Sequence, residues 1–253
     1  MIKKELCWNI TSKCNQHCIY CFRDKISQDC TLRENMDILQ YIVSKGVSEL
    51  TWSGGEPLLY DGIDILLRTA FEHKIINKIN TNASLLSKEY LNKIADYIDT
   101  FTLSLDTCNP NVNENLGRGY YHQYNVYTTV NQIKKYYPTK TVTINVVVNR
   151  LNINTMDELI RNLNNLPIDG VRLFQVSPIR GQAIDTFEKT SIKQTQFAQA
   201  RELFLTNLTN KNVTFRDKTS LEKEYLIITP SGNLCYNDNG KDILIKQLRG
   251  INR

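Results

Sequence analysis

Apolar residues follow two alternating patterns along this chain. Short runs rich in β-branched and aromatic residues, such as 49–52 and 141–148, are typical of strands that are buried in a sheet. Longer stretches with apolar residues three or four positions apart, such as 32–45, are typical of amphipathic helices. The predicted strands are 5–10, 49–52, 78–81, 101–105, 141–148 and 171–176, and the predicted helices are 32–45, 63–74, 87–97, 121–137 and 155–164.

This alternation predicts an α/β fold with a parallel sheet and right-handed crossovers. Six strand–helix units fall short of a closed eight-fold barrel, so we expect a partial (β/α)6 TIM-like barrel. After Pro178 the pattern changes to a long helix over 192–210 and a hairpin over 225–236 that turns at Ser231-Gly232. We therefore expect the barrel to occupy residues 1–180 and a short α+β C-terminal extension, packed on the barrel, to occupy 181–253.

Three cysteines lie close together directly after the first predicted strand. Cys14, Cys18 and Cys21 have the spacing C-x3-C-x2-C. Three thiolates in one loop can bind three irons of a cubane 4Fe–4S cluster, and the fourth iron then stays open for another ligand. The spacing alone leaves two alternatives, a tetrahedral zinc site completed by His17 and a purely structural cluster.

A glycine pair followed by a glutamate ends the second predicted strand. The segment is Gly54-Gly55-Glu56-Pro57, preceded by Ser53. Glycines allow the backbone to approach a ligand closely, and a glutamate accepts hydrogen bonds from an ammonium group. By itself the segment is compatible with an ordinary turn, but its position after the cysteine motif argues against a zinc site.

Together these two motifs resemble the signature of the radical S-adenosylmethionine (radical SAM) superfamily. The resemblance implies a 4Fe–4S cluster on the three cysteines, with S-adenosylmethionine (SAM) chelated to the open iron. It also implies that the GGEP segment holds the amino group of SAM and that Tyr20 contacts its adenine. In this family the cluster reduces SAM to methionine and a 5′-deoxyadenosyl radical, which abstracts hydrogen from a substrate.

The remaining candidates follow the third and fourth predicted strands. Asn82 follows the third strand, and Ser104 and Asp106 end the fourth. The carboxyl ends of barrel strands carry the chemistry in folds of this kind, so these side chains are expected beside SAM.

Further segments are similar to the viperin-like branch, whose members dehydrate a nucleoside triphosphate. The resemblance implies that Ser104 in LSLD and Arg118 in LGRG hold the SAM carboxylate, and that Asn145 in INVVVNR belongs to the same cavity. It also implies that Tyr225 returns a hydrogen atom to the substrate radical. The expected substrate is therefore a small polar, nucleotide-like molecule, and the expected enzyme is of the lyase or oxidoreductase type.

Two positions depart from this branch. Glu49 and Thr143 stand where viperin-type enzymes carry basic residues around the triphosphate, and only Arg172, Arg23 or Lys25 offer a replacement. The sequence thus predicts poor turnover of free nucleoside triphosphates and a less charged substrate.

Composition narrows the class of partner. The net charge of +5 comes without a dense basic run, so nucleic-acid binding is not indicated. No apolar run is long enough to span a bilayer, and Cys7, Cys30, Cys108 and Cys235 are too scattered for a disulfide framework. We expect a cytoplasmic protein that receives electrons from a reductase or a flavodoxin- or ferredoxin-type donor.

Two structural expectations remain. His73 and His122 are expected to be exposed, and the Asn-rich stretch 109–115 is expected to be a solvated loop.

A peptide-modifying radical SAM maturase is the alternative function. A cluster-bearing sensor that performs no chemistry is a third, less consistent with GGEP, Ser104 and Arg118.

Overall fold

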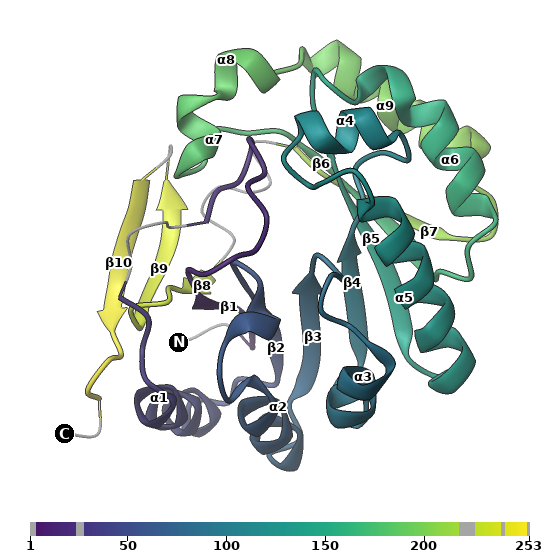
Figure 1. Ribbon diagram of the computed structural model, residues 1–253. Helices are drawn as coiled ribbons and strands as arrows, with labels where there is room; N and C mark the ends of the chain where they lie inside the picture. Colours follow the sequence, from purple (N-terminus) through teal and green to yellow (C-terminus); the bar gives the residue numbers. More distant parts are fainter. Residues whose placement is uncertain (1–3, 24–27, 218–225, 239–240, 252–253) are drawn as a thin grey trace.

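The computed structural model describes residues 4–23, 28–217, 226–238 and 241–251. In these residues all strands join one sheet in the order β10-β9-β8-β1-β2-β3-β4-β5-β6-β7 (Figure 1). The strands are β1 (Glu5–Thr11), β2 (Glu49–Gly54), β3 (Ile76–Thr81), β4 (Thr100–Ser104), β5 (Thr141–Val148), β6 (Gly170–Gln175), β7 (Asn212–Arg216), β8 (Leu226–Ile228), β9 (Asn233–Asp238) and β10 (Lys241–Gln247).

Helices connect the successive parallel strands. Neighbouring strands from β1 to β7 pair in parallel, β8 pairs in parallel with β1, and β9 and β10 add antiparallel strands at that edge. The helices are α1 (Leu32–Ser44), α2 (Ile63–Glu72), α3 (Lys88–Ile94), α4 (Pro110–Asn115), α5 (His122–Tyr136), α6 (Met156–Asn164), α7 (Gln182–Asp185), α8 (Phe187–Thr190) and α9 (Gln194–Asn207), with 3-10 turns at Pro57–Leu59, Ala95–Tyr97 and Ile153–Thr155.

The sheet curves, and the two faces have different roles. Helices α1, α2, α3, α5 and α6 lie along its outer face, while the loop after β1 lies on the inner side (Figure 1). Strand β5 illustrates the difference between the two faces, because its buried residues alternate strictly with half-buried ones. Val142, Ile144 and Val146 are fully buried, whereas Asn145 and Val147 line a cavity on the inner face. This is the expected partial TIM-like barrel with its polar side chains directed inward.

Local signals in the sequence set the helix boundaries. Thr31 and Glu34 form a capping box at the start of α1, in which the Thr31 Oγ1 accepts from the Glu34 amide at 3.3 Å and the Glu34 carboxylate accepts from the Thr31 amide at 2.9 Å. The Ser87 hydroxyl caps α3 by accepting from the Tyr90 amide at 3.1 Å. Helix α5 ends just before Pro138, which cannot continue it.

Two stacked indoles mark the centre of the core. Trp8 of β1 and Trp52 of β2 are fully buried, with ring centroids 5.2 Å apart and an interplanar angle of 18°. The Trp52 Nε1 donates to the Asn77 Oδ1 at 2.8 Å, and the Asn77 Nδ2 donates to the carbonyls of Leu67 and Tyr97 at 3.0 and 2.9 Å. One buried amide thus bonds polar groups of a strand, a helix and a 3-10 turn.

The structure corrects the sequence-based expectation in two places. The stretch 109–115 is not a solvated loop, because Asn109 caps helix α4 and Asn113 is fully buried. A parallel strand, β7, follows α9 where no strand was expected. Strand β7 is short and lies at the edge of the sheet, where its side chains are exposed or only half-buried. Its sequence therefore lacks the continuous apolar run that marks the buried strands. The hairpin around Ser231-Gly232 is present as β8 and β9.

We predict that Asn77→Ala lowers the free energy of unfolding by roughly 2–4 kcal/mol. The substitution leaves the Trp52 indole N–H without an acceptor and removes the side-chain donor to the Leu67 and Tyr97 carbonyls, and a buried polar group without a partner costs about 1–3 kcal/mol. Chemical denaturation under reducing conditions measures the change. Asn131→Ala, which removes a single exposed side-chain bond on α5, is the control and is expected to cost under about 1 kcal/mol. Equal effects of the two variants would contradict this role of Asn77.

Candidate active site

A cavity opens on the inner face of the sheet at the carboxyl ends of its parallel strands. Its lining combines the cysteine loop, defined here as residues 12–23, with inward-facing residues of β1 to β6, β8 and β9. The sequence-predicted residues in this lining are Cys14, Cys18, Cys21, Tyr20, Gly54, Gly55, Asn82, Ser104, Arg118 and Asn145. Glu56, Pro57 and Asp106 lie behind the wall, and Tyr225 lies outside the described residues.

The GGEP segment grips the start of the cysteine loop through the backbone. The Gly55 amide donates to the Thr11 carbonyl at 2.7 Å, and the Glu56 amide donates to the Lys13 carbonyl at 2.8 Å. A Cβ atom on Gly54 would lie 2.5 Å from the Thr11 oxygen, and one on Gly55 would lie 2.0 Å from the Lys13 oxygen. The glycines are therefore required for the two segments to pack so closely.

Two other glycines receive the middle and the end of the same loop. The His17 amide donates to the Gly117 carbonyl at 3.0 Å, and a Cβ on Gly117 would lie 2.3 Å from the His17 oxygen. Farther along, a Cβ on Gly181 would lie 2.6 Å from the Arg23 oxygen, and the Ala183 amide donates to the Cys21 carbonyl at 3.1 Å. The cysteine loop is thus clamped at three separate points.

This clamp presents all three loop thiols to one cavity. Within the described residues no three His, Cys, Asp or Glu side chains are arranged to hold a single metal ion, and the exposed His17 does not line the cavity. Burial raises the pKa of the Cys18 thiol to about 11, although Arg118 lowers it, and binding of a metal centre requires the ionised thiolate. Three thiols of one loop that face a single cavity suit a cluster with one open iron.

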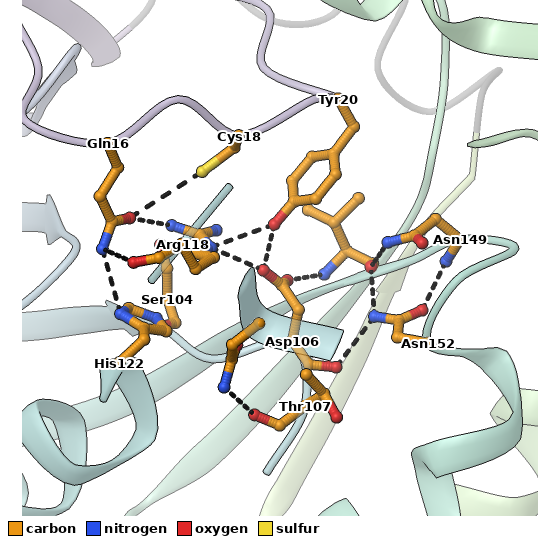
Figure 2. A network of polar contacts seen from close by, with 12 residues as sticks. Gln16, Cys18, Tyr20, Ser104, Asp106, Thr107, Arg118, His122, Asn149 and Asn152 are labelled. Atoms are coloured by element: carbon orange, nitrogen blue, oxygen red, sulfur yellow. Dashed lines mark hydrogen bonds and ion pairs between the residues drawn. The ribbon is translucent and has the colours of Figure 1, made fainter. Parts of the chain in front are cut away.

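Asp106 is the hub of a buried polar network beneath the loop (Figure 2). Its Oδ2 accepts from the Tyr20 hydroxyl and, at 2.8 Å, from the Arg118 Nε, while its Oδ1 accepts from the Val147 amide at 2.7 Å. The Asp106 carbonyl accepts from the Asn152 Nδ2 at 2.9 Å. A fully buried carboxylate is thereby paired and hydrogen-bonded on both oxygens, which is the condition for keeping it charged.

Gln16 and His122 extend this network, and neither was predicted from the sequence. The Gln16 Oε1 accepts from the Arg118 Nη1 at 3.1 Å (Figure 2). The His122 Nε2 lies 2.7 Å from the Ser104 carbonyl, which can only accept, so Nε2 carries the proton. The Nδ1 then accepts from the Gln16 Nε2 at 3.2 Å. His122 is buried rather than exposed, because it begins α5 facing the cysteine loop, and only tertiary packing reveals that.

Glu56 is committed to protein donors on both carboxylate oxygens. Its Oε1 accepts from the Thr81 hydroxyl at 2.7 Å and the Leu58 amide at 3.3 Å, and its Oε2 accepts from the Asn82 amide at 2.8 Å. Burial raises the pKa of Glu56 to about 7, although these three donors favour the ionised form. The carboxylate ties β3 to the turn after β2 from behind the cavity wall.

Unpaired amide oxygens face the cavity from two of the strands, β3 and β5. Within the described residues, the buried Oδ1 atoms of Asn80 and Asn145 have no hydrogen-bond partner in the protein, and both residues line the cavity. Asn82 is different, because its Nδ2 donates to the Asn15 Oδ1 at 2.8 Å and its Oδ1 accepts from the Ser84 hydroxyl at 2.6 Å. Buried acceptors without partners indicate a place where a polar ligand binds.

We predict that Gly55→Ala reduces the iron content reached by anaerobic reconstitution. The new methyl group overlaps the Lys13 carbonyl and displaces the cysteine loop, at a cost of about 1–3 kcal/mol in unfolding free energy. Gly119→Ala is the control, because its Cβ meets nothing within 4 Å and only its left-handed backbone is strained. Iron analysis and circular dichroism measure both variants. Wild-type iron content in Gly55→Ala would show that this close packing is dispensable.

We predict a specific pH signature for His122. Burial, and secondarily Arg118, lowers the pKa of His122 to about 4, so the folded protein holds the neutral ring. Its stabilising contribution is therefore complete above the unfolded pKa of about 6.5 and is lost as pH falls toward 4. The stability difference between wild type and His122→Gln should shrink by about 2 kcal/mol between pH 7 and pH 5. Denaturation curves that stay parallel over this range would contradict the assignment.

Two curated proteins are similar to this chain over most of its length. A Flammeovirga pacifica protein named S-adenosylmethionine-dependent nucleotide dehydratase is 28% identical over 251 residues, which cover 92% of this chain and 82% of the relative. A Lacinutrix mariniflava protein of the same name is 25% identical over 250 residues, covering 92% of this chain and 50% of the relative. The chain thus spans most of one relative and half of the other.

Solved structures show the same fold. Streptococcus suis SuiB bound to S-adenosylmethionine matches with a TM-score of 0.72 at 22% identity, covering 91% of this chain and 59% of that chain. SuiB bound to precursor peptide SuiA matches with a TM-score of 0.74 at 21% identity, covering 98% of this chain and 64% of that chain. The sequence profile of the Radical SAM superfamily matches residues 8–163, from β1 into α6. Because that match covers more than half of the chain and includes both the cysteine motif and GGEP, the chain belongs to the radical SAM superfamily, near its viperin-like branch.

Proposed function

We propose that this radical SAM enzyme acts on a small anionic, nucleotide-like molecule and catalyses a dehydration or a related lyase-type rearrangement. One observation carries the proposal. Among the described residues, the cavity lining contains no aspartate or glutamate and four arginines, Arg23, Arg118, Arg172 and Arg180. A cavity with this charge pattern favours anions, such as a phosphate and the carboxylate of SAM.

The superfamily's cofactors, a 4Fe–4S cluster and SAM, fit the residues present. Cys14, Cys18 and Cys21 would hold the cluster, since all three line the cavity from one loop. Cys7 also lines the cavity, but it lies on β1 outside the C-x3-C-x2-C motif. When bound, the reduced cluster and SAM together supply a 5′-deoxyadenosyl radical. Ser104 and Arg118 would bind the SAM carboxylate, and the unpartnered Asn145 oxygen offers an acceptor beside them.

Arg118 is oriented before any ligand arrives. Its Nε donates to Asp106 and its Nη1 donates to Gln16, so the guanidinium cannot rotate away from the cavity wall. The side chain is only 9% exposed, and its remaining donors stay available. A fixed guanidinium loses little freedom when it binds a carboxylate.

Arg172 is a cavity arginine that lies beside the residues proposed to bind SAM. It lies in a row across three strands, because Ser104 pairs with Asn145 and Asn145 pairs with Arg172 in the sheet register. Glu49 and Thr143, which stand where viperin-type enzymes carry basic residues, lie elsewhere. Glu49 forms an ion pair with Lys78 and Thr143 bonds the Thr102 hydroxyl at 2.9 Å, and neither Glu49 nor Thr143 is part of the cavity lining. The prediction of poor triphosphate turnover, made from these two positions, stays a prediction.

Other parts of the sequence-based account remain proposals. A hydrogen-atom return by Tyr225 falls outside the described residues, and a reductase or flavodoxin- or ferredoxin-type protein is the proposed electron donor. Within the described residues no helix is long and apolar enough to cross a membrane. The likeness to peptide-bound SuiB concerns the fold, so a peptide substrate enters as an outcome of the assay below.

The test is production of 5′-deoxyadenosine by reduced, cluster-loaded protein with SAM. Candidates are nucleoside mono-, di- and triphosphates, the matching nucleosides and short peptides. We expect phosphorylated nucleosides to raise 5′-deoxyadenosine formation at least about tenfold over the unstimulated rate, which corresponds to about 1.4 kcal/mol. Mass spectrometry should show a nucleotide product that has lost one water. Stimulation by peptides alone, or by nucleosides regardless of phosphate, would contradict the proposal.

A further inference from the structure

Arg180 is a cavity arginine that the sequence analysis did not single out. It lies between β6 and α7, lines the cavity, and has a side chain that is only 14% exposed. Its Nη2 lies 2.6 Å from the Asp242 Oδ1 on β10. The antiparallel pair β9–β10, called the C-terminal hairpin below, thus holds the Arg180 side chain in place. An arginine whose function is to fasten two surface segments would face outward, whereas this one faces the cavity.

The ion pair with Asp242 engages Nη2 of Arg180 and leaves its Nε without an acceptor among the described residues. Arginine has five N–H donors, and the Nε of Arg180 is buried without a partner among the described residues. The same Asp242 oxygen also accepts from the Asn237 Nδ2 at 3.0 Å, so it is shared between two donors. A buried donor without a partner is costly, and a ligand that accepts from it removes that cost.

The backbone beside Arg180 is fixed against the cysteine loop. The next residue, Gly181, packs so closely on Arg23 that a Cβ would lie 2.6 Å from its carbonyl oxygen. The Arg23 guanidinium also lines the cavity, and its Nη1 donates to the Ser12 carbonyl at 3.2 Å. Two guanidiniums thus approach the cavity from adjoining segments near Cys21, at a position distinct from the strand row that carries Arg172.

We propose that Arg180, oriented by Asp242, binds an anionic phosphate group of the substrate. This inference rests on the proposed function and makes it more specific, since it assigns a phosphate contact to the segment after β6 and makes Asp242 a positioning residue. A phosphate accepts in a fork from the Nε hydrogen of Arg180 and the Nη2 hydrogen on the same side of the guanidinium, while the other Nη2 hydrogen stays on Asp242. The substrate is therefore a nucleotide whose phosphate extends toward the cysteine loop and the C-terminal hairpin.

The test compares Arg180→Gln with a matched control, Arg249→Gln. Arg249 also joins the C-terminal segment to the barrel, through its Nε and the Glu34 Oε1 at 2.9 Å, but it does not line the cavity. Calorimetric titration of cluster-loaded, SAM-bound protein uses three probes, inorganic tripolyphosphate, CTP and cytidine. We expect Arg180→Gln to weaken tripolyphosphate and CTP roughly 10–150-fold, and to leave SAM affinity and any cytidine binding unchanged. Arg180→Lys should recover part of the loss, because it restores the charge without the fork.

The outcomes separate this inference from the proposed function. Selective loss of phosphate binding in Arg180→Gln supports the inference even if no nucleotide is converted, in which case only the proposed reaction fails. Normal conversion of a nucleotide by Arg180→Gln overturns the inference and leaves the reaction standing. Equal losses in Arg180→Gln and Arg249→Gln, equal losses for all three probes, or no binding of either anion by wild type would each overturn it as well.

Discussion

The site depends on the close backbone packing of the cysteine loop against three glycine-containing segments. Gly55, Gly117 and Gly181 each lie where a Cβ would fall within 2.6 Å of a loop carbonyl. These segments follow β2, β4 and β6, so the sheet positions the loop at points far apart in the sequence. The three thiols therefore face one cavity, which is the arrangement that a cluster bound by three cysteines requires.

The charged groups around the cavity are divided between its lining and the residues outside the lining. The acidic groups that orient the site, the buried Asp106 and the exposed Asp242, lie outside the cavity lining, and each pairs with an arginine that belongs to the lining. The described lining therefore presents guanidinium groups and neutral amides without a competing carboxylate. This arrangement fixes the arginines and lets an anionic ligand, rather than a protein acid, complete their hydrogen bonds. The same reasoning underlies the proposals that Arg118 binds the carboxylate of SAM and that Arg180 binds the phosphate of a nucleotide.

The sequence predicted what depends on local chemistry. The alternation of strands and helices was sufficient for the barrel, and the cysteine spacing and GGEP placed two segments at the cavity, while Ser104, Arg118 and Asn145 came from the resemblance to the viperin-like branch. Gln16, His122 and Arg180 were missed, because their positions depend on tertiary contacts that no spacing records. Glu56 shows the converse. Its motif was correctly placed at the cavity, but its carboxylate turns toward Thr81 and Asn82 behind the wall.

The most direct test of this account is electron paramagnetic resonance of the reduced, iron-reconstituted protein before and after SAM is added. The account predicts the signal of one reduced 4Fe–4S cluster whose g-values shift when SAM binds the open iron, with both the signal and the shift lost in Cys14→Ala. A signal that does not respond to SAM, or one that survives in Cys14→Ala unchanged, would contradict the claim that the clamped cysteine loop holds an open cluster.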